Sequence, residues 1–221
     1  MERPAAVRVK ICGINSAEAL AAAVAAGADW IGFVFFPRSP RALTPTEAAS
    51  LSARAPAAAQ PGAPQRVGLF VDPTDAEVAA ALDAVALDAL QVYAGAERAA
   101  AIRLRFGRPV WRALGIAERT DLPAALGGAD ALVIEPKAPE DATRPGGNAR
   151  RLDWALLRNW VAPGEWLLAG GLSPANVAAA IAATGAHAVD VSSGVERAPG
   201  RKDPALIHAF IAAARGVEGA R

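Results

Sequence analysis

Residues 7–27 read VRVKICGINSAEALAAAVAAG, a strand-like run followed by a helix-like run. Apolar and polar side chains alternate up to Cys12, with the period of two that is typical of a half-buried strand. Ser16 is a suitable N-cap for a helix that extends to Ala26, and Gly27 is a suitable residue to end it. This stretch therefore predicts one βα unit.

The same order recurs to the end of the chain. Strand-like runs lie at 7–12, 30–36, 66–71, 89–93, 110–114, 131–135, 166–169 and 187–191. Helical patterns follow them, among them 96–104, a short one that ends at 126, and 153–160, 173–183 and 204–214. Eight such units predict an α/β fold, a (β/α)8 TIM barrel, with residues 1–221 as one catalytic domain. An open doubly wound sheet is the alternative, but the dinucleotide pattern G-x-G-x-x-G is absent after the first strand.

Composition excludes several classes of protein. Hydrophobic residues make up 53% of the 221 residues, which argues against a disordered chain. Lys and Arg number 23 against 22 Asp and Glu, so no charge excess points to nucleic acid or to a membrane surface as partner. The single cysteine excludes an intrachain disulfide and fits a cytoplasmic setting. We expect no signal peptide, no membrane span and no metal site.

In a barrel of this kind, chemistry gathers where the strands end. Lys10 and Cys12 share one face of the first strand, which we expect to point into the barrel. Cys12 is either a small buried hydrophobic residue or a base whose pKa is lowered by the cation of Lys10. Lys10 itself either pairs with a carboxylate or, less simply, forms a Schiff base.

Two further strand ends carry charged residues. Arg38 and Arg41 follow the second strand, where they are either solvated surface residues or a fork for a carboxylate or phosphate. Glu135 ends the sixth strand and is either a general acid or base, or an ion-pair partner of Lys10 or Arg112. The loop 136–152 that follows is long enough to cover the mouth of a site.

The last two units carry turns of small residues. A glycine turn, Gly170-Gly171, follows the seventh strand and leads into a helix at Ser173-Pro174. Ser192-Ser193-Gly194 follows the eighth strand. Backbone amides after strands seven and eight form the phosphate site of many barrels, so the two turns together favour a phosphorylated substrate.

At these positions the sequence resembles the phosphoribosylanthranilate isomerases of tryptophan biosynthesis. The resemblance covers nearly the whole chain and rests on four stretches in order: 9–14 (VKICGI), 32–41 (GFVFFPRSPR), 169–172 (AGGL) and 189–196 (VDVSSGVE). It implies a (β/α)8 barrel without a cofactor. It also implies an Amadori rearrangement of N-(5-phosphoribosyl)anthranilate to 1-(2-carboxyphenylamino)-1-deoxyribulose 5-phosphate.

The resemblance also implies roles for individual residues. Cys12 would be the base at C2 of the sugar, Arg41 would hold the anthranilate carboxylate, and Asp190 would support the anilino nitrogen or its surroundings. The amides at Gly170, Gly171, Ser192, Ser193 and Gly194 would bind the phosphate.

The sequence departs from the family at two strand ends. Glu135 stands where the family has an aspartate as general acid, and Tyr93 stands where the family has a histidine. We expect Glu135 to be the acid. A divergent paralogue that acts on another phosphorylated sugar amine, and a weakly catalytic barrel that binds phosphorylated ligands, are the alternative functions. A monomer and a homodimer are equally compatible with the sequence.

Overall fold

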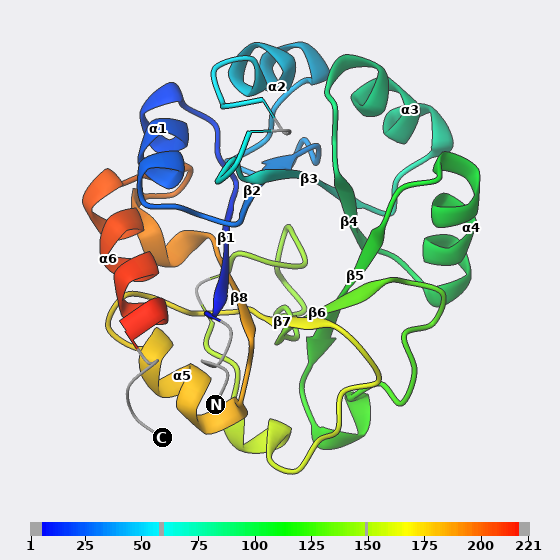
Figure 1. Cartoon of the computed structure of the whole chain (residues 1–221). Helices are drawn as coiled ribbons and strands as arrows, with labels where there is room; N and C mark the ends of the chain where they lie inside the picture. The colour runs from blue at the N-terminus through cyan, green and yellow to red at the C-terminus, as the bar shows by residue number, and fades with distance from the viewer. Residues whose placement is uncertain (1–5, 58–59, 149, 217–221) are drawn as a thin grey trace.

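The computed structural model describes residues 6–57, 60–148 and 150–216, and in it eight parallel strands close into a barrel. Figure 1 looks into this barrel, with the helices outside the strands. The strands are β1 (Arg8–Cys12), β2 (Trp30–Val34), β3 (Gln65–Val71), β4 (Ala89–Tyr93), β5 (Val110–Ile116), β6 (Ala131–Pro136), β7 (Trp166–Leu168) and β8 (Ala188–Val191). Strand β1 pairs with both β2 and β8, which closes the ring and confirms the predicted fold class.

Small side chains and two tryptophans fill the inside of the barrel. Trp30 and Trp111 meet edge to face there, with ring centroids 5.2 Å apart. The buried cluster around them is completed by short or branched residues, Val67, Ala89, Ala113, Ala131, Val133, Leu167, Ala169 and Ala188. The alanines leave the room that the two indoles occupy, so the interior is a packed core rather than a pore.

Six α-helices lie around the described part of the barrel, and local signals set their ends. They are α1 (Ala17–Ala25), α2 (Pro45–Ser52), α3 (Asp75–Ala84), α4 (Ala96–Phe106), α5 (Val177–Thr184) and α6 (Pro204–Arg215). Ser16 caps α1, and Thr44 and Glu47 form a reciprocal capping box at the start of α2. Buried aliphatic residues between these helices and the strands form the larger core, for example Ile11, Leu20 and Phe210.

The predicted helices after β5 and β6 are wrong. Only single 3-10 turns form there, η1 (Arg119–Asp121) and η2 (Trp154–Leu157). Pro123 cannot donate a backbone hydrogen bond, which prevents a regular helix to 126. This sector is instead covered by indole packing, because Trp160 stacks edge to face on Trp166 and donates its Nε1 hydrogen to Pro123 O.

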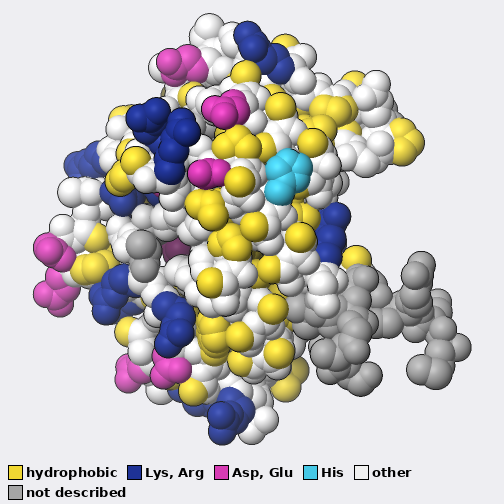
Figure 2. All heavy atoms as spheres, turned by 90° about the vertical axis from the view of Figure 1, so that its left-hand side faces the viewer, with side chains coloured by type: hydrophobic (Ala, Val, Ile, Leu, Met, Phe, Trp, Pro, Cys, Tyr) yellow, Lys and Arg dark blue, Asp and Glu magenta, His cyan; other side chains and the backbone are white. Residues whose placement is uncertain are grey.

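The outer surface carries charges of both signs. Figure 2 shows the side of the barrel that bears α1 and α6, where hydrophobic side chains and uncharged polar or backbone atoms lie between the acidic and basic side chains. None of the helices in the described part of the chain is long and apolar enough to cross a membrane.

Candidate active site

A cavity opens at the carboxyl ends of the strands. It is lined by every residue that the sequence predicts for the site: Cys12, Arg41, Glu135, Gly170, Gly171, Asp190, Ser192, Ser193 and Gly194. Parts of the long loop after β6 also line it, at 137–138, 144–148 and Arg150, so this loop lies over the mouth as expected.

Lys10 and Cys12 point into the barrel, as their alternation on β1 predicts. Lys10 is fully buried, and its Nζ lies 3.0 Å from Oδ1 of Asp190, its register partner on β8. Gly32 on β2 faces both side chains: a Cβ there would lie 3.1 Å from Cys12 Sγ and 3.3 Å from Lys10 Nζ. The missing side chain at Gly32 thus leaves room for the thiol and the ammonium to lie side by side.

The pKa of the Cys12 thiol is raised, so the nearby cation of Lys10 does not bring it below its ordinary value. Burial is the largest cause and disfavours the thiolate, and the charge of Asp190 acts in the same direction. Lys10 does lower the pKa of Cys12, but not enough to offset burial. Because Asp190 and Cys12 more than offset the effect of burial on Lys10, the pKa of its ammonium is raised. Lys10 is therefore protonated at neutral pH, and its positive charge stabilises the thiolate that forms when Cys12 loses its proton.

Glu135 meets Tyr93 rather than Lys10 or Arg112. Glu135 is 5% exposed, and a Cβ on Gly146 would lie 2.9 Å from both of its carboxyl oxygens and 2.2 Å from Tyr93 Oη. Burial raises the pKa of Glu135 to about 8, against the opposing effect of a hydrogen bond from Tyr93. Burial and the neighbouring Glu135 also raise the pKa of Tyr93 well above its usual value. At neutral pH this carboxyl group is protonated and faces the cavity, as a proton donor requires.

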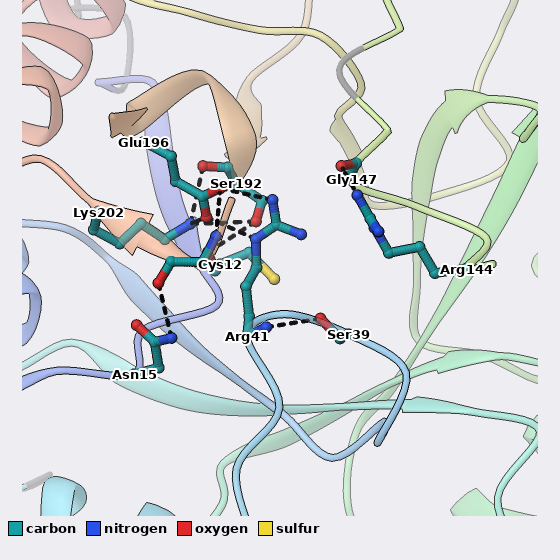
Figure 3. Close-up of polar contacts among 10 residues, drawn as sticks. Cys12, Asn15, Ser39, Arg41, Arg144, Gly147, Ser192, Glu196 and Lys202 are labelled. Carbon is teal, nitrogen blue, oxygen red and sulfur yellow. Dashed lines mark hydrogen bonds and ion pairs between the residues drawn. The ribbon is translucent and has the colours of Figure 1, made fainter. Parts of the chain in front are cut away.

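Arg38 and Arg41 differ in burial. Arg38 is exposed, whereas Arg41 is 3% exposed. Arg41 Nε and Nη2 donate to the two carboxylate oxygens of Glu196, over 2.7 and 2.8 Å (Figure 3). Its third nitrogen, Nη1, has no hydrogen-bond partner among the described residues and faces Gly147 of the covering loop. One edge of the guanidinium group thus remains for an anionic ligand.

The two glycine-rich turns pack against each other. Gly170 and Gly171 both adopt positive φ, and a Cβ on Gly194 would lie 1.7 Å from Leu172 O. Helix α5 begins at Val177, later than the predicted start at Ser173-Pro174. The reason is Asn176, whose side chain accepts from Ser173 N and donates to Gly171 O, and so completes a turn before the helix.

Sequence reasoning missed two residues that contact the predicted site. Glu196 and Lys202 belong to a hairpin of β9 (Glu196–Ala198) and β10 (Arg201–Lys202) that follows β8. Glu196 was part of a motif without a role, and no periodic signal marks Lys202. Both side chains are buried, which is rare for charged residues. This burial is what points to a role for them, and it can be seen only in the structure.

Within the described residues, no group of three or more His, Cys, Asp and Glu side chains is placed to hold a metal ion. The polar groups that line the cavity include a thiol, the carboxyl groups of Glu135 and Asp190, the phenol of Tyr93, guanidinium and ammonium groups and backbone amides. This set suits proton transfer on a ligand that carries negative charge at more than one point.

Comparisons with known proteins agree on one family. The family model for N-(5'phosphoribosyl)anthranilate (PRA) isomerase matches residues 9–213. The N-(5'-phosphoribosyl)anthranilate isomerase of Acidiphilium cryptum is 56% identical over 209 residues, which are 94% of this chain and 98% of that protein.

Solved structures give the same result. TrpF from Jonesia denitrificans superposes with a TM-score of 0.81 at 36% identity, over 98% of this chain and 100% of that chain. A phosphoribosyl anthranilate isomerase in complex with reduced 1-(o-carboxyphenylamino)-1-deoxyribulose 5-phosphate superposes with a TM-score of 0.78 at 34% identity, over 95% and 99% of the two chains.

Proposed function

The chain belongs to the N-(5'-phosphoribosyl)anthranilate isomerase family, and from this membership together with its site we infer how it carries out the reaction. It is an enzyme of tryptophan biosynthesis, an intramolecular oxidoreductase of the aldose–ketose type. It converts N-(5'-phosphoribosyl)anthranilate to 1-(2-carboxyphenylamino)-1-deoxyribulose 5-phosphate. The observation that carries the assignment of roles is the protonated carboxyl of Glu135 in the same cavity as the only thiol of the chain.

Ring opening is the first step. Glu135 donates its proton to the furanose oxygen of the substrate, the C1–O bond breaks, and the anilino nitrogen forms an iminium with C1. Because its pKa is about 8, the carboxyl group of Glu135 is protonated at neutral pH and can donate that proton. Tyr93 lies against the carboxyl and supplies a hydrogen-bond partner to the carboxylate that remains after the transfer.

Removal of the C2 proton is the second step. The thiolate of Cys12 takes this proton, and the electron pair of the C2–H bond neutralises the iminium to give an enolamine. Tautomerisation of the enolamine then gives the C2 ketone, so no atom is gained or lost overall. Lys10 stabilises the thiolate because its ammonium group lies beside Sγ.

The two charged ends of the substrate bind to different donors. Arg41 binds the anthranilate carboxylate through its Nη1 edge. Asp190, held by Lys10, supports the anilino nitrogen. The backbone amides of the turns at Gly170-Gly171 and 192–194 bind the phosphate.

The direct test is a fluorescence assay with phosphoribosylanthranilate generated in situ. Protein-dependent loss of the anthranilate-type signal is the expected result. Persistence of the signal at high protein concentration would contradict the function, and heat-inactivated protein is the matched blank.

Substitution of Arg41 separates the two ends of the substrate. In Arg41→Met, we expect KM for the substrate and the inhibition constant of anthranilate to rise by about 10- to 100-fold, because a charge-assisted hydrogen bond is lost. The inhibition constant of inorganic phosphate should barely change. Glu196 keeps its second partner, Lys202, so the fold is retained.

Arg38→Met is the control for Arg41→Met, because it removes the same charge from an exposed neighbour. Its kinetics should match those of the unsubstituted protein. Equal weakening of anthranilate and phosphate in Arg41→Met would place Arg41 at the phosphate end and overturn its assignment.

The pH dependence of kcat/KM follows from the two pKa shifts. Turnover needs a protonated Glu135 and a deprotonated Cys12. Below about pH 8 Glu135 is protonated and the thiolate fraction grows with pH, so kcat/KM rises with a slope of about one. Between that value and the raised pKa of Cys12, loss of the acid offsets gain of the base and kcat/KM is flat. Above the pKa of Cys12, kcat/KM falls, because the thiol is then fully ionised and the protonated fraction of Glu135 continues to decrease.

An independent measurement assigns the limbs of this profile. The chain has one thiol, so the pH dependence of its alkylation by iodoacetamide reports the pKa of Cys12 alone. This pKa should match the alkaline limb. A match to the acidic limb instead would mean that Glu135 and Cys12 titrate in the opposite order.

We further propose that residues 1–221 act as a single catalytic domain in the cytoplasm, without a cofactor, as a monomer or a homodimer. The phosphorylated sugar is the small-molecule partner. The single cysteine of the chain supports the cytoplasmic location.

A further inference from the structure

Behind the cavity, one chain of polar contacts joins the end of β1 at Cys12, the 192–194 turn and Arg41 (Figure 3). Lys202 Nζ donates to Ser192 O over 2.9 Å and to Glu196 Oε1 over 2.8 Å. Ser192 Oγ donates to the backbone oxygen of Cys12 over 3.2 Å. Glu196 accepts from Arg41 at both oxygens and from Gly200 N over 3.1 Å. Lys202 and Glu196, to which the sequence assigned no role, make most of these bonds.

The charges of this cluster do not cancel. Arg41, Lys202 and Glu196 are almost fully buried and carry two positive charges and one negative charge. Burial lowers the pKa of Lys202 to about 8, and Arg41 adds to the effect, while Glu196 opposes it. Burial alone would raise the pKa of Glu196, but the bonds from Arg41 and Lys202 bring it below the usual value. A net positive charge at a buried site is destabilising, and an anion that binds nearby offsets it.

We propose that Glu196 and Lys202 are positioning residues that set the two anion subsites of this enzyme: Glu196 orients Arg41 for the carboxylate, and Lys202 holds the 192–194 turn for the phosphate. The proposal rests on the proposed function of the cavity. Neither residue touches the reacting atoms, so each acts through a neighbour.

Glu196 acts by occupying two of the nitrogens of Arg41. The bidentate pair fixes the guanidinium plane and directs Nη1 towards the cavity, where a substrate carboxylate can reach only that edge. Without Glu196 the guanidinium group is free to turn, and the position of the bound ring is no longer defined.

Lys202 acts by holding the carbonyl of Ser192. Lys202 does not line the cavity, whereas residues 192–194 do, so its bond to the Ser192 carbonyl holds the turn from behind and leaves the amides that follow available to an anion. The hydroxyl of Ser192 ties the same turn to β1 at Cys12. The phosphate subsite and the base are thereby kept in fixed relation.

The test compares Glu196→Gln, Lys202→Met and the double variant Glu196→Gln/Lys202→Met, using calorimetric binding of anthranilate and of inorganic phosphate together with kcat and KM. Arg201→Met is the matched control, because Arg201 is the exposed neighbour of Lys202 on β10. We expect Glu196→Gln to weaken anthranilate about tenfold and phosphate less, and Lys202→Met to do the reverse. KM should rise more than kcat falls, and Arg201→Met should behave as the unsubstituted protein.

Charge alone predicts a different outcome. Glu196→Gln increases the positive charge of the cluster, so an effect of the field alone would tighten both anions, whereas lost orientation weakens anthranilate. The double variant keeps the net charge of the original cluster and is expected to weaken both probes. It replaces Glu196→Gln as the test if two unpaired cations prevent folding.

Tighter or unchanged binding of both probes in Glu196→Gln, or a double variant that binds as the unsubstituted protein does, would overturn the proposal. An equal loss of both probes in both single variants would show that the pair is only structural. These readouts need binding and no turnover, so they remain interpretable if the isomerase assay fails, and failure of either idea is seen separately.

Discussion

Replacement of Cys12 by alanine is expected to abolish turnover while the fold and ligand binding persist. A general base contributes about 10²- to 10⁴-fold to a rate, so kcat should fall by about that factor. Cys12→Ser should also be very weak, because a hydroxyl is far less acidic than a thiol even beside Lys10. The measurement is kcat in the in situ fluorescence assay, with the circular dichroism spectrum and the anthranilate affinity of each variant as evidence of an intact site.

The reason for the expected loss is the position of the thiol. Cys12 ends β1 at the mouth of the cavity, and it is the only thiol of the chain. Retention of most of kcat by Cys12→Ala would mean that Cys12 is a packing residue beside Val34 and Leu69 and that the base lies elsewhere.

Glu135→Gln is expected to lose nearly all activity, on the order of 10²- to 10⁴-fold, because glutamine keeps the size of the side chain but cannot give up a proton. Glu135→Asp should also be slower than the original enzyme. A shorter side chain would withdraw the carboxyl from Tyr93 and Gly146, and a misplacement of about 1 Å can cost on the order of 10²-fold.

Two outcomes would count against this acid. Near-normal turnover by Glu135→Gln would show that another group protonates the ring oxygen. The second is an unchanged acidic limb of the pH profile in the residual activity of Glu135→Asp, because that limb is assigned to the carboxyl at residue 135.

The strands and the site were largely predictable because their signals are local. Strand β4 begins and ends where the sequence predicts, at Ala89 and Tyr93, and Lys10 and Cys12 face inwards as alternation requires. The rule that chemistry gathers at strand ends then brings Cys12 and Glu135 into one cavity.

The errors come from interactions between distant residues. Trp160 and Trp166, rather than a helix, cover the sector after β6, and local periodicity does not report such packing. Arg41 and Glu196 are 155 residues apart in the chain, so their ion pair has no sequence pattern. The pKa of Cys12 depends on how completely the fold buries the thiol, which alternation alone does not give.

The contact between Gly194 and Leu172 also limits how this protein can change over generations. Every other amino acid would place a Cβ 1.7 Å from the Leu172 carbonyl oxygen, so any substitution at 194 forces the backbone of the two turns to move. Nor does a smaller residue at 172 help, since the obstructing atom is backbone. The two turns are therefore constrained to change together, since a side chain at 194 could be accommodated only if the backbone at Leu172 also moved.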